Sequence, residues 1–184
     1  MPVRGTMMGN RGCLVDADGR LHRRWQGERW IICVLEFAGR VHHPLMSPRH
    51  YTHLFFLDEA TACAAGHRPC FECRRPAARA FVDAWWSARP GRDGSLRELD
   101  TRLHRERTAL ASPPVDCGEL PDGVMVARDG RAWLVRGDAL LPWSHEGYGE
   151  PVSRQEGPVA VLTPPSTVAA MRQGWQPELH PSAG

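Results

Sequence analysis

The part of the sequence with the clearest chemistry runs from residue 66 to residue 75 and reads Gly66-His67-Arg68-Pro69-Cys70-Phe71-Glu72-Cys73-Arg74-Arg75. Two cysteines separated by two residues can both direct their sulfurs at one metal ion, at about 2.3 Å from each, because the intervening backbone forms a tight turn. A redox-active pair would instead open a helix directly after a core strand. Here the pair follows a predicted short helix and a proline, so the sequence favours metal binding.

A structural zinc site normally has four protein ligands, so this pair needs two more. Cys33 lies in the middle of an apolar run that predicts a buried strand, and Cys13 lies in a predicted hairpin beside it. We therefore expect a four-cysteine zinc site. Its ligands are Cys13, Cys33, Cys70 and Cys73, and the alternatives for the first two are His42 or His43. Cys63 and Cys117 are interpreted as packing residues.

Upstream of the cysteine pair, residues 54 to 73 read LFFLDEATACAAGHRPCFEC. This stretch resembles the second half of the metal-binding domain of the DNA repair protein Ada, in which a strand, a short alanine-rich helix, a Gly-aromatic-Arg-Pro run and Cys-x-x-Cys follow one another. The likeness extends more loosely upstream to Trp30 and covers about a quarter of the chain. Over its whole length the chain is also similar to a group of actinobacterial proteins, a resemblance that implies no activity.

The Ada resemblance implies a module that holds one zinc through four cysteines, the first of which accepts a methyl group from a DNA phosphotriester. Cys70 and Cys73 match the last two ligands. Counting back to the expected place of the first two leads to the segment from Gly39 to His43, which contains no cysteine. The resemblance therefore implies zinc binding and a relation to DNA repair, but it does not supply the methyl-accepting thiolate.

The pattern of apolar residues and turns predicts an α+β fold: an Ada-like zinc-binding module with a C-terminal β-meander half. Strands are expected at 30–37 and 51–56, then a helix capped by Asp58 and a second helix from Pro76 that buries its aromatic face. Further strands are expected at 124–127, 132–136, 139–143 and 158–162, before a last helix capped by Ser166. The expected regions are a zinc-binding module at 1–90, a linker and charged helix at 91–114, and a β-rich region at 115–184.

Composition narrows the class of protein. The hydrophobic fraction of 42% is enough for a core, and no stretch reaches the roughly 20 apolar residues of a membrane span. The sequence also lacks the apolar run of a signal peptide, so we expect no membrane partner and a cytoplasmic location. The net charge is only +2, yet all 23 Lys and Arg residues are arginine, which is typical of GC-rich genomes and also suits phosphate recognition.

These observations predict a zinc-binding protein that interacts with DNA or RNA. Arginines beside the cysteine pair and on the charged helix are expected to form one phosphate-binding surface, made of Arg68, Arg74, Arg75, Arg102 and Arg105. The alternative is a metal-dependent enzyme that acts on a small molecule or nucleic acid, in which His145, Glu146 and Tyr148 line a pocket beside the zinc. A fourth thiolate ligand would favour the structural role of zinc over the catalytic one.

Overall fold

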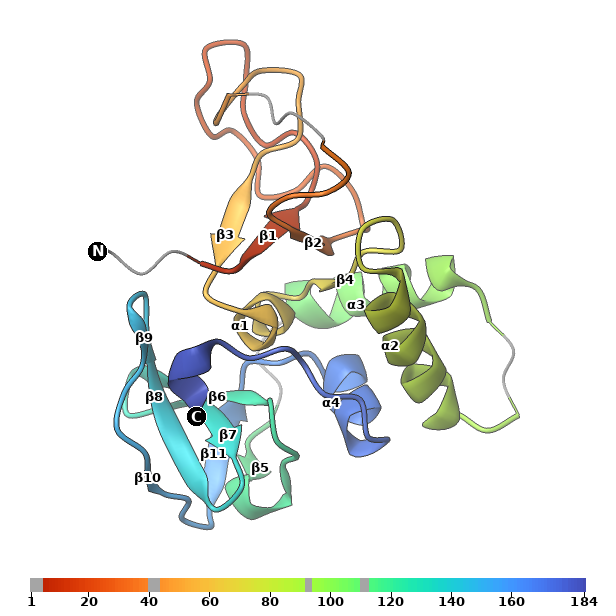
Figure 1. Ribbon diagram of the computed structural model, residues 1–184. Helices are drawn as coiled ribbons and strands as arrows, with labels where there is room; N and C mark the ends of the chain where they lie inside the picture. Colours follow the sequence, from red (N-terminus) through yellow and green to blue (C-terminus); the bar gives the residue numbers. More distant parts are fainter. Residues whose placement is uncertain (1–4, 40–43, 92–93, 110–112) are drawn as a thin grey trace.

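The computed structural model describes residues 5–39, 44–91, 94–109 and 113–184, and the fold combines helices and sheets. Figure 1 shows the strands of the first half above a helical layer and the strands of the second half below it. In the first half the elements are β1 (Met7–Asn10), β2 (Ile31–Val34), β3 (Leu54–Phe56), α1 (Glu59–Ala64), β4 (Arg68–Pro69), α2 (Arg75–Ser87) and α3 (Leu96–Thr108). The second half contains β5 (Val115–Asp116), β6 (Met125–Arg128), β7 (Arg131–Arg136), β8 (Ala139–Ser144), β9 (Gly147–Tyr148), β10 (Val152–Ser153), β11 (Pro158–Val161) and α4 (Pro165–Arg172).

The strands form two sheets. The first has the order β3-β1-β2-β4, in which β1 pairs antiparallel with both neighbours while β2 pairs with β4 in parallel. The second has the order β10-β8-β7-β6-β11-β5, with β9 added to β8. Strands β6, β7 and β8 form the predicted meander, and tight turns at Asp129-Gly130 and Gly137-Asp138 connect them.

Local sequence signals placed most helices correctly. The Asp58 side chain accepts a hydrogen bond from the Thr61 amide at 2.9 Å and caps α1, as predicted. Pro76 lies in the first turn of α2, and the helix buries Phe81 and Trp85 completely. The prediction for Ser166 was wrong, since α4 begins without a side-chain cap, and Ser166 donates through its amide and hydroxyl to Glu106 of α3 instead.

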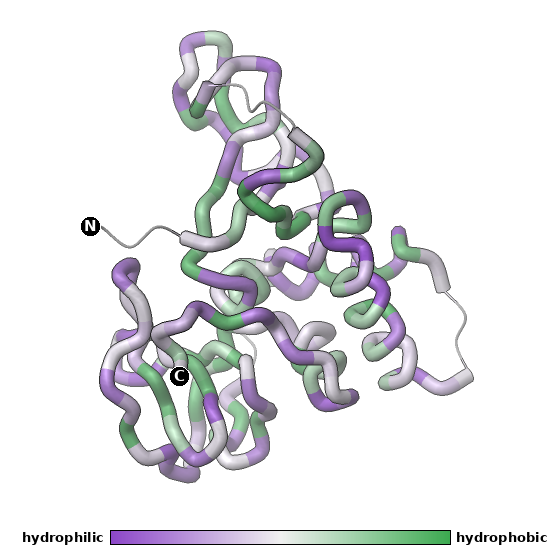
Figure 2. Tube along the Cα trace, viewed as in Figure 1, coloured by the Kyte–Doolittle hydropathy of each residue, from purple (hydrophilic) through white to green (hydrophobic). Residues whose placement is uncertain are grey.

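One hydrophobic core joins both halves of the chain. It combines Ile32 of β2, Phe81 of α2 and Leu103 of α3 with Leu140 of β8 and Met171 of α4. Figure 2 shows hydrophobic residues in the strands of both halves and in the helices between them. All three regions predicted from the sequence, 1–90, 91–114 and 115–184, contribute side chains to this cluster.

The segment from Glu178 to His180 lies against the first turn of α1. Its Glu178 amide donates to the Glu59 carboxylate at 2.8 Å, and its His180 amide donates to Asp58 at 3.1 Å. The Tyr148 hydroxyl donates to the same Asp58 carboxylate at 2.9 Å. The two buried acids at the start of α1 therefore hold together three distant parts of the chain.

No helix in the described part of the chain is both long and apolar enough to span a bilayer.

Candidate metal centre

The parallel pairing of β2 with β4 brings Cys33 beside Cys70. In this register Ile31 faces Arg68 and Ile32 faces Pro69, and the Cys70 amide donates to the Ile32 carbonyl at 3.0 Å. The next residue of β2 is Cys33, which therefore lies next to Cys70 although 37 positions separate them in the sequence. This placement depends on strand pairing and not on local spacing.

Cys73 reaches the same place because the chain turns sharply after β4. The Arg74 amide donates to the Cys70 carbonyl at 3.0 Å and closes the turn, and the Glu72 amide points at the Cys70 sulfur at 3.4 Å. Helix α2 begins at Arg75, immediately after this turn. The first turn of this helix therefore lies directly beside Cys73.

The sulfurs of Cys33, Cys70 and Cys73 lie within 4.8 Å of one another. Tetrahedral zinc with sulfur ligands at about 2.3 Å requires sulfurs that are about 3.8 Å apart, so one ion fits among these three with small side-chain adjustments. Cys70 is buried and the other two cysteines are half-buried. Thiolates are soft ligands that suit zinc, copper(I) and iron–sulfur clusters, so these three cysteines can bind a metal ion.

The three thiols are electrostatically coupled. A hydrogen bond from the Cys33 thiol lowers the pKa of Cys70 to about 5, and the amides of Glu72 and Cys73 contribute to the same shift. The pKa of Cys33 is raised, mainly because its proton is donated to Cys70, and burial raises the pKa of Cys73. Without a cation one thiolate forms readily and the other two resist ionisation, whereas a divalent ion would allow all three to ionise.

Cys13 is not a member of this group. Its sulfur donates to the Val15 carbonyl at 3.4 Å, in the loop that follows β1. The structure thus brings together three of the four predicted cysteine ligands, and it places Cys13 elsewhere because residues 11–30 leave the sheet instead of continuing beside β2. The alternative ligands His42 and His43 lie outside the described residues. Cys63 and Cys117 are fully buried in the core, where the sequence predicted packing roles for them.

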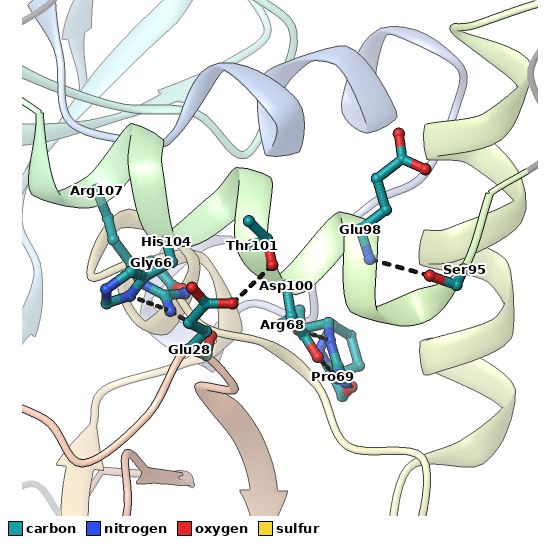
Figure 3. Close-up of polar contacts among 10 residues, drawn as sticks. All are labelled: Glu28, Gly66, Arg68, Pro69, Ser95, Glu98, Asp100, Thr101, His104 and Arg107. Atoms are coloured by element: carbon teal, nitrogen blue, oxygen red, sulfur yellow. Dashed lines mark hydrogen bonds and ion pairs between the residues drawn. The ribbon is translucent and has the colours of Figure 1, made fainter.

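Two of the five predicted phosphate-binding arginines are buried in ion pairs. Arg68 forms a two-pronged pair with Asp100 of α3, through contacts of 2.7 and 2.8 Å, as Figure 3 shows. Arg74 pairs with the buried Glu59 and with Glu178. Their placement on a nucleic-acid surface was therefore wrong, since both guanidinium groups are already neutralised inside the protein. Arg75, Arg102 and Arg105 are exposed, and Arg102 contacts Glu106 one helical turn away.

The residues of the alternative, enzymatic interpretation do not meet the cysteines. His145 and Glu146 are exposed in the turn between β8 and β9, which Figure 1 shows well apart from the turn between β4 and α2. Tyr148 is buried and bonded to Asp58. The predicted pocket of these three residues beside the metal is therefore absent from the described part of the structure.

The sequence did not predict a second group of interacting side chains, in which two arginines share one tryptophan. The guanidinium carbons of Arg11 and Arg107 lie 4.0 and 3.8 Å from the centre of the Trp30 ring, so one buried tryptophan is shared by two cations. Arg107 comes from α3, and Arg11 directly follows β1, 96 positions earlier in the sequence. No spacing rule relates them.

Comparisons with known proteins add no assignment. No protein family model matches the chain, and neither a curated protein nor a solved structure matches it significantly.

Proposed function

We propose that this chain is a zinc-stabilised protein that interacts with nucleic acid. The observation that carries the proposal is the group of Cys33, Cys70 and Cys73, whose sulfurs lie within 4.8 Å of one another. A zinc ion there would tie β2 to the turn that starts α2. Because both elements pack into the common core, the ion would act mainly as a cross-link, as structural zinc does in small modules.

Elemental analysis of the purified protein tests the metal assignment. We expect about one zinc per chain in the wild type and its loss in Cys33→Ser, Cys70→Ser and Cys73→Ser, because each change removes a thiolate. Each variant should also lose several kcal/mol of unfolding free energy with the metal. A loss of 1 kcal/mol lowers the melting temperature by about 2–4 °C in a protein of this size, so we expect a fall of roughly 10 °C or more.

Cys13→Ser is the matched control. Cys13 is half-buried and lies in the same half of the chain as the three cysteines, but it does not belong to their group. Zinc content should therefore stay at the wild-type level. A wild-type protein that contains no zinc when freshly made would refute the assignment, and loss of zinc in Cys13→Ser would show that the fourth ligand is the one expected from the sequence.

The nucleic-acid part of the proposal is supported by the exposed Arg75, Arg102 and Arg105, of which Arg102 also contacts Glu106. It is also supported by the likeness of residues 54–73 to a module from a DNA repair protein. Binding to DNA or RNA should weaken as salt rises, because each phosphate contact releases bound counterions. Titration of random duplex and single-stranded oligonucleotides at several salt concentrations tests this. An absence of any binding at low salt would refute it.

A metal-dependent enzyme is the second candidate. The described residues offer three thiolates to one ion, and a catalytic zinc keeps three protein ligands plus a water molecule. Cobalt(II) substitution distinguishes the two roles. An open position would bind added azide and change the visible absorption spectrum, whereas a fully coordinated structural site would leave the spectrum unchanged.

A further inference from the structure

A cleft of about 1050 Å³ lies between the two halves of the molecule, separate from the three cysteines. One wall comes from residues 11–30 and α3, and the other comes from β11 and α4. Five arginines line it: Arg11, Arg23, Arg24, Arg107 and Arg172. The one acidic side chain among the described lining residues is Glu106, whose carboxylate is occupied by Ser166 and Arg102. The cleft therefore carries a strong positive charge.

The two innermost arginines have only neutral partners. Arg11 donates to a nitrogen of His67 at 3.2 Å and to the Ala65 carbonyl at 3.4 Å. Arg107 donates to the Gly66 carbonyl at 2.8 Å and contacts His104 at 3.0 Å, and its Nε has no partner within the described structure. Figure 3 shows this arrangement around Arg107.

No ion pair joins either arginine to a carboxylate in the part of the chain that the structure describes. The nearest acids to Arg107 are already engaged, since Asp100 pairs with Arg68 and Glu28 accepts a hydrogen bond from Thr101. Burial lowers the pKa of Arg107 to about 9, against the opposing charges of Asp100 and Glu28, and lowers that of Arg11 to about 10. Two partly desolvated cations without a direct ion-pair partner form a site suited to an anion.

The same wall of the cleft also presents an aromatic surface. Trp25 is about one-third exposed, and its ring lies 5.9 Å from Trp30 and 5.4 Å from the edge-on ring of His104. An exposed tryptophan among arginines is the combination used by proteins that bind single strands, where bases stack on aromatic rings and arginines follow the phosphates. A duplex keeps its bases stacked inside, so it could not use this ring.

We propose that this cleft binds a segment of single-stranded nucleic acid, with phosphates on the arginines and a base stacked on Trp25. The inference rests on the proposed interaction with nucleic acid and assigns it a place and a form of substrate. The volume of the cleft is close to the upper end of the range for small-ligand pockets, about 300–1,000 Å³. The cleft therefore accommodates part of a single strand but not a double helix.

Fluorescence anisotropy of labelled oligothymidylate, twelve nucleotides long, tests this with the zinc-loaded full chain. Trp25→Ala should weaken binding by roughly 5- to 150-fold, the range found when one stacked base loses its aromatic partner, and Trp25→Phe should restore much of it. Arg24→Gln/Arg172→Gln removes one cation from each wall. It should weaken binding and reduce the slope of log affinity against log salt by about 1.4, because each phosphate contact to a single strand contributes about 0.7.

Arg131→Gln/Arg136→Gln is the matched control, since it removes two exposed arginines of β7 outside the cleft and should leave the affinity unchanged. Circular dichroism and zinc content verify that each variant is folded. If the cleft variants bind as tightly as the wild type, the assignment to the cleft is wrong while the proposed function stands. Binding of duplex but not of oligothymidylate would have the same meaning, and binding of neither would refute both. Thymidine monophosphate should compete only weakly, and equal affinity for it would overturn the assignment to a strand.

Discussion

His67 is completely buried, and its surroundings hold it in the neutral form. Its Nδ1 lies 3.2 Å from the Ala62 carbonyl, which can only accept, while its Nε2 accepts from Arg11, which can only donate. The proton therefore belongs on Nδ1. Burial, and then the charge of Arg11, lower the pKa of His67 well below its usual range.

This state predicts a loss of stability in acid. Below about pH 6.5 the unfolded chain protonates the histidine while the folded chain does not, so the free energy of unfolding falls as pH falls. Between pH 6.5 and 5.5 we expect a loss of about 1 kcal/mol from His67 alone. Urea unfolding of wild type and His67→Gln over this range measures it. Glutamine can keep both hydrogen bonds without titrating, so an equal pH dependence in the two proteins would contradict the prediction.

At the scale of single residues the sequence predicted what is local. Asp58 was identified as a cap because the cap and the helix turn that it bonds are three residues apart. Arg68 and Arg74 were misplaced because their buried partners Asp100 and Glu59 lie 32 and 15 positions away, beyond the reach of local spacing rules. An arginine that will be buried in an ion pair has no sequence signature that distinguishes it from one that faces solvent.

At the scale of elements, the Arg68–Asp100 pair fastens α3 to β4. Both side chains are removed from solvent, so Arg68→Met should leave an unpaired buried carboxylate and lower the free energy of unfolding by roughly 3–5 kcal/mol. The double variant Arg68→Met/Asp100→Leu should recover most of that loss, because it removes both charges. Chemical denaturation measures both effects. A double variant no more stable than the single one would show that the carboxylate is not the source of the loss.

The elements themselves were predicted with uneven success. The meander of β6, β7 and β8 was evident because its turns and alternating strands are adjacent in the sequence. The apolar run 30–37 predicted a longer strand than β2, which ends at Val34 because Leu35 and Glu36 are exposed beyond the sheet. The parallel pairing of β2 with the two-residue β4 brings Cys33 beside Cys70, and no sequence pattern predicted this pairing. Pairing between strands distant in sequence is not visible in the periodicity of either one.

At the scale of the whole molecule, the common core predicts a single cooperative unfolding transition. Leu103 of α3 is fully buried between side chains of both halves, so Leu103→Ala should lower the free energy of unfolding by roughly 2–5 kcal/mol. Tryptophan fluorescence and far-ultraviolet circular dichroism should report the same shift. Two transitions, with only one displaced by the substitution, would show that the halves unfold independently.

The attachment of Glu178 and His180 to α1 has a consequence for the order of synthesis. A ribosome adds about 5–20 residues per second, so the cysteines of the metal centre are translated on the order of 5–20 s before the segment that satisfies Glu59 and Asp58. During that interval Asp58 and Glu59 lack these two amide donors, while the nascent chain already carries Cys70 and Cys73 at the spacing of a metal-ligand pair. A metal ion can therefore bind this pair before the contacts of Glu178 and His180 complete the fold.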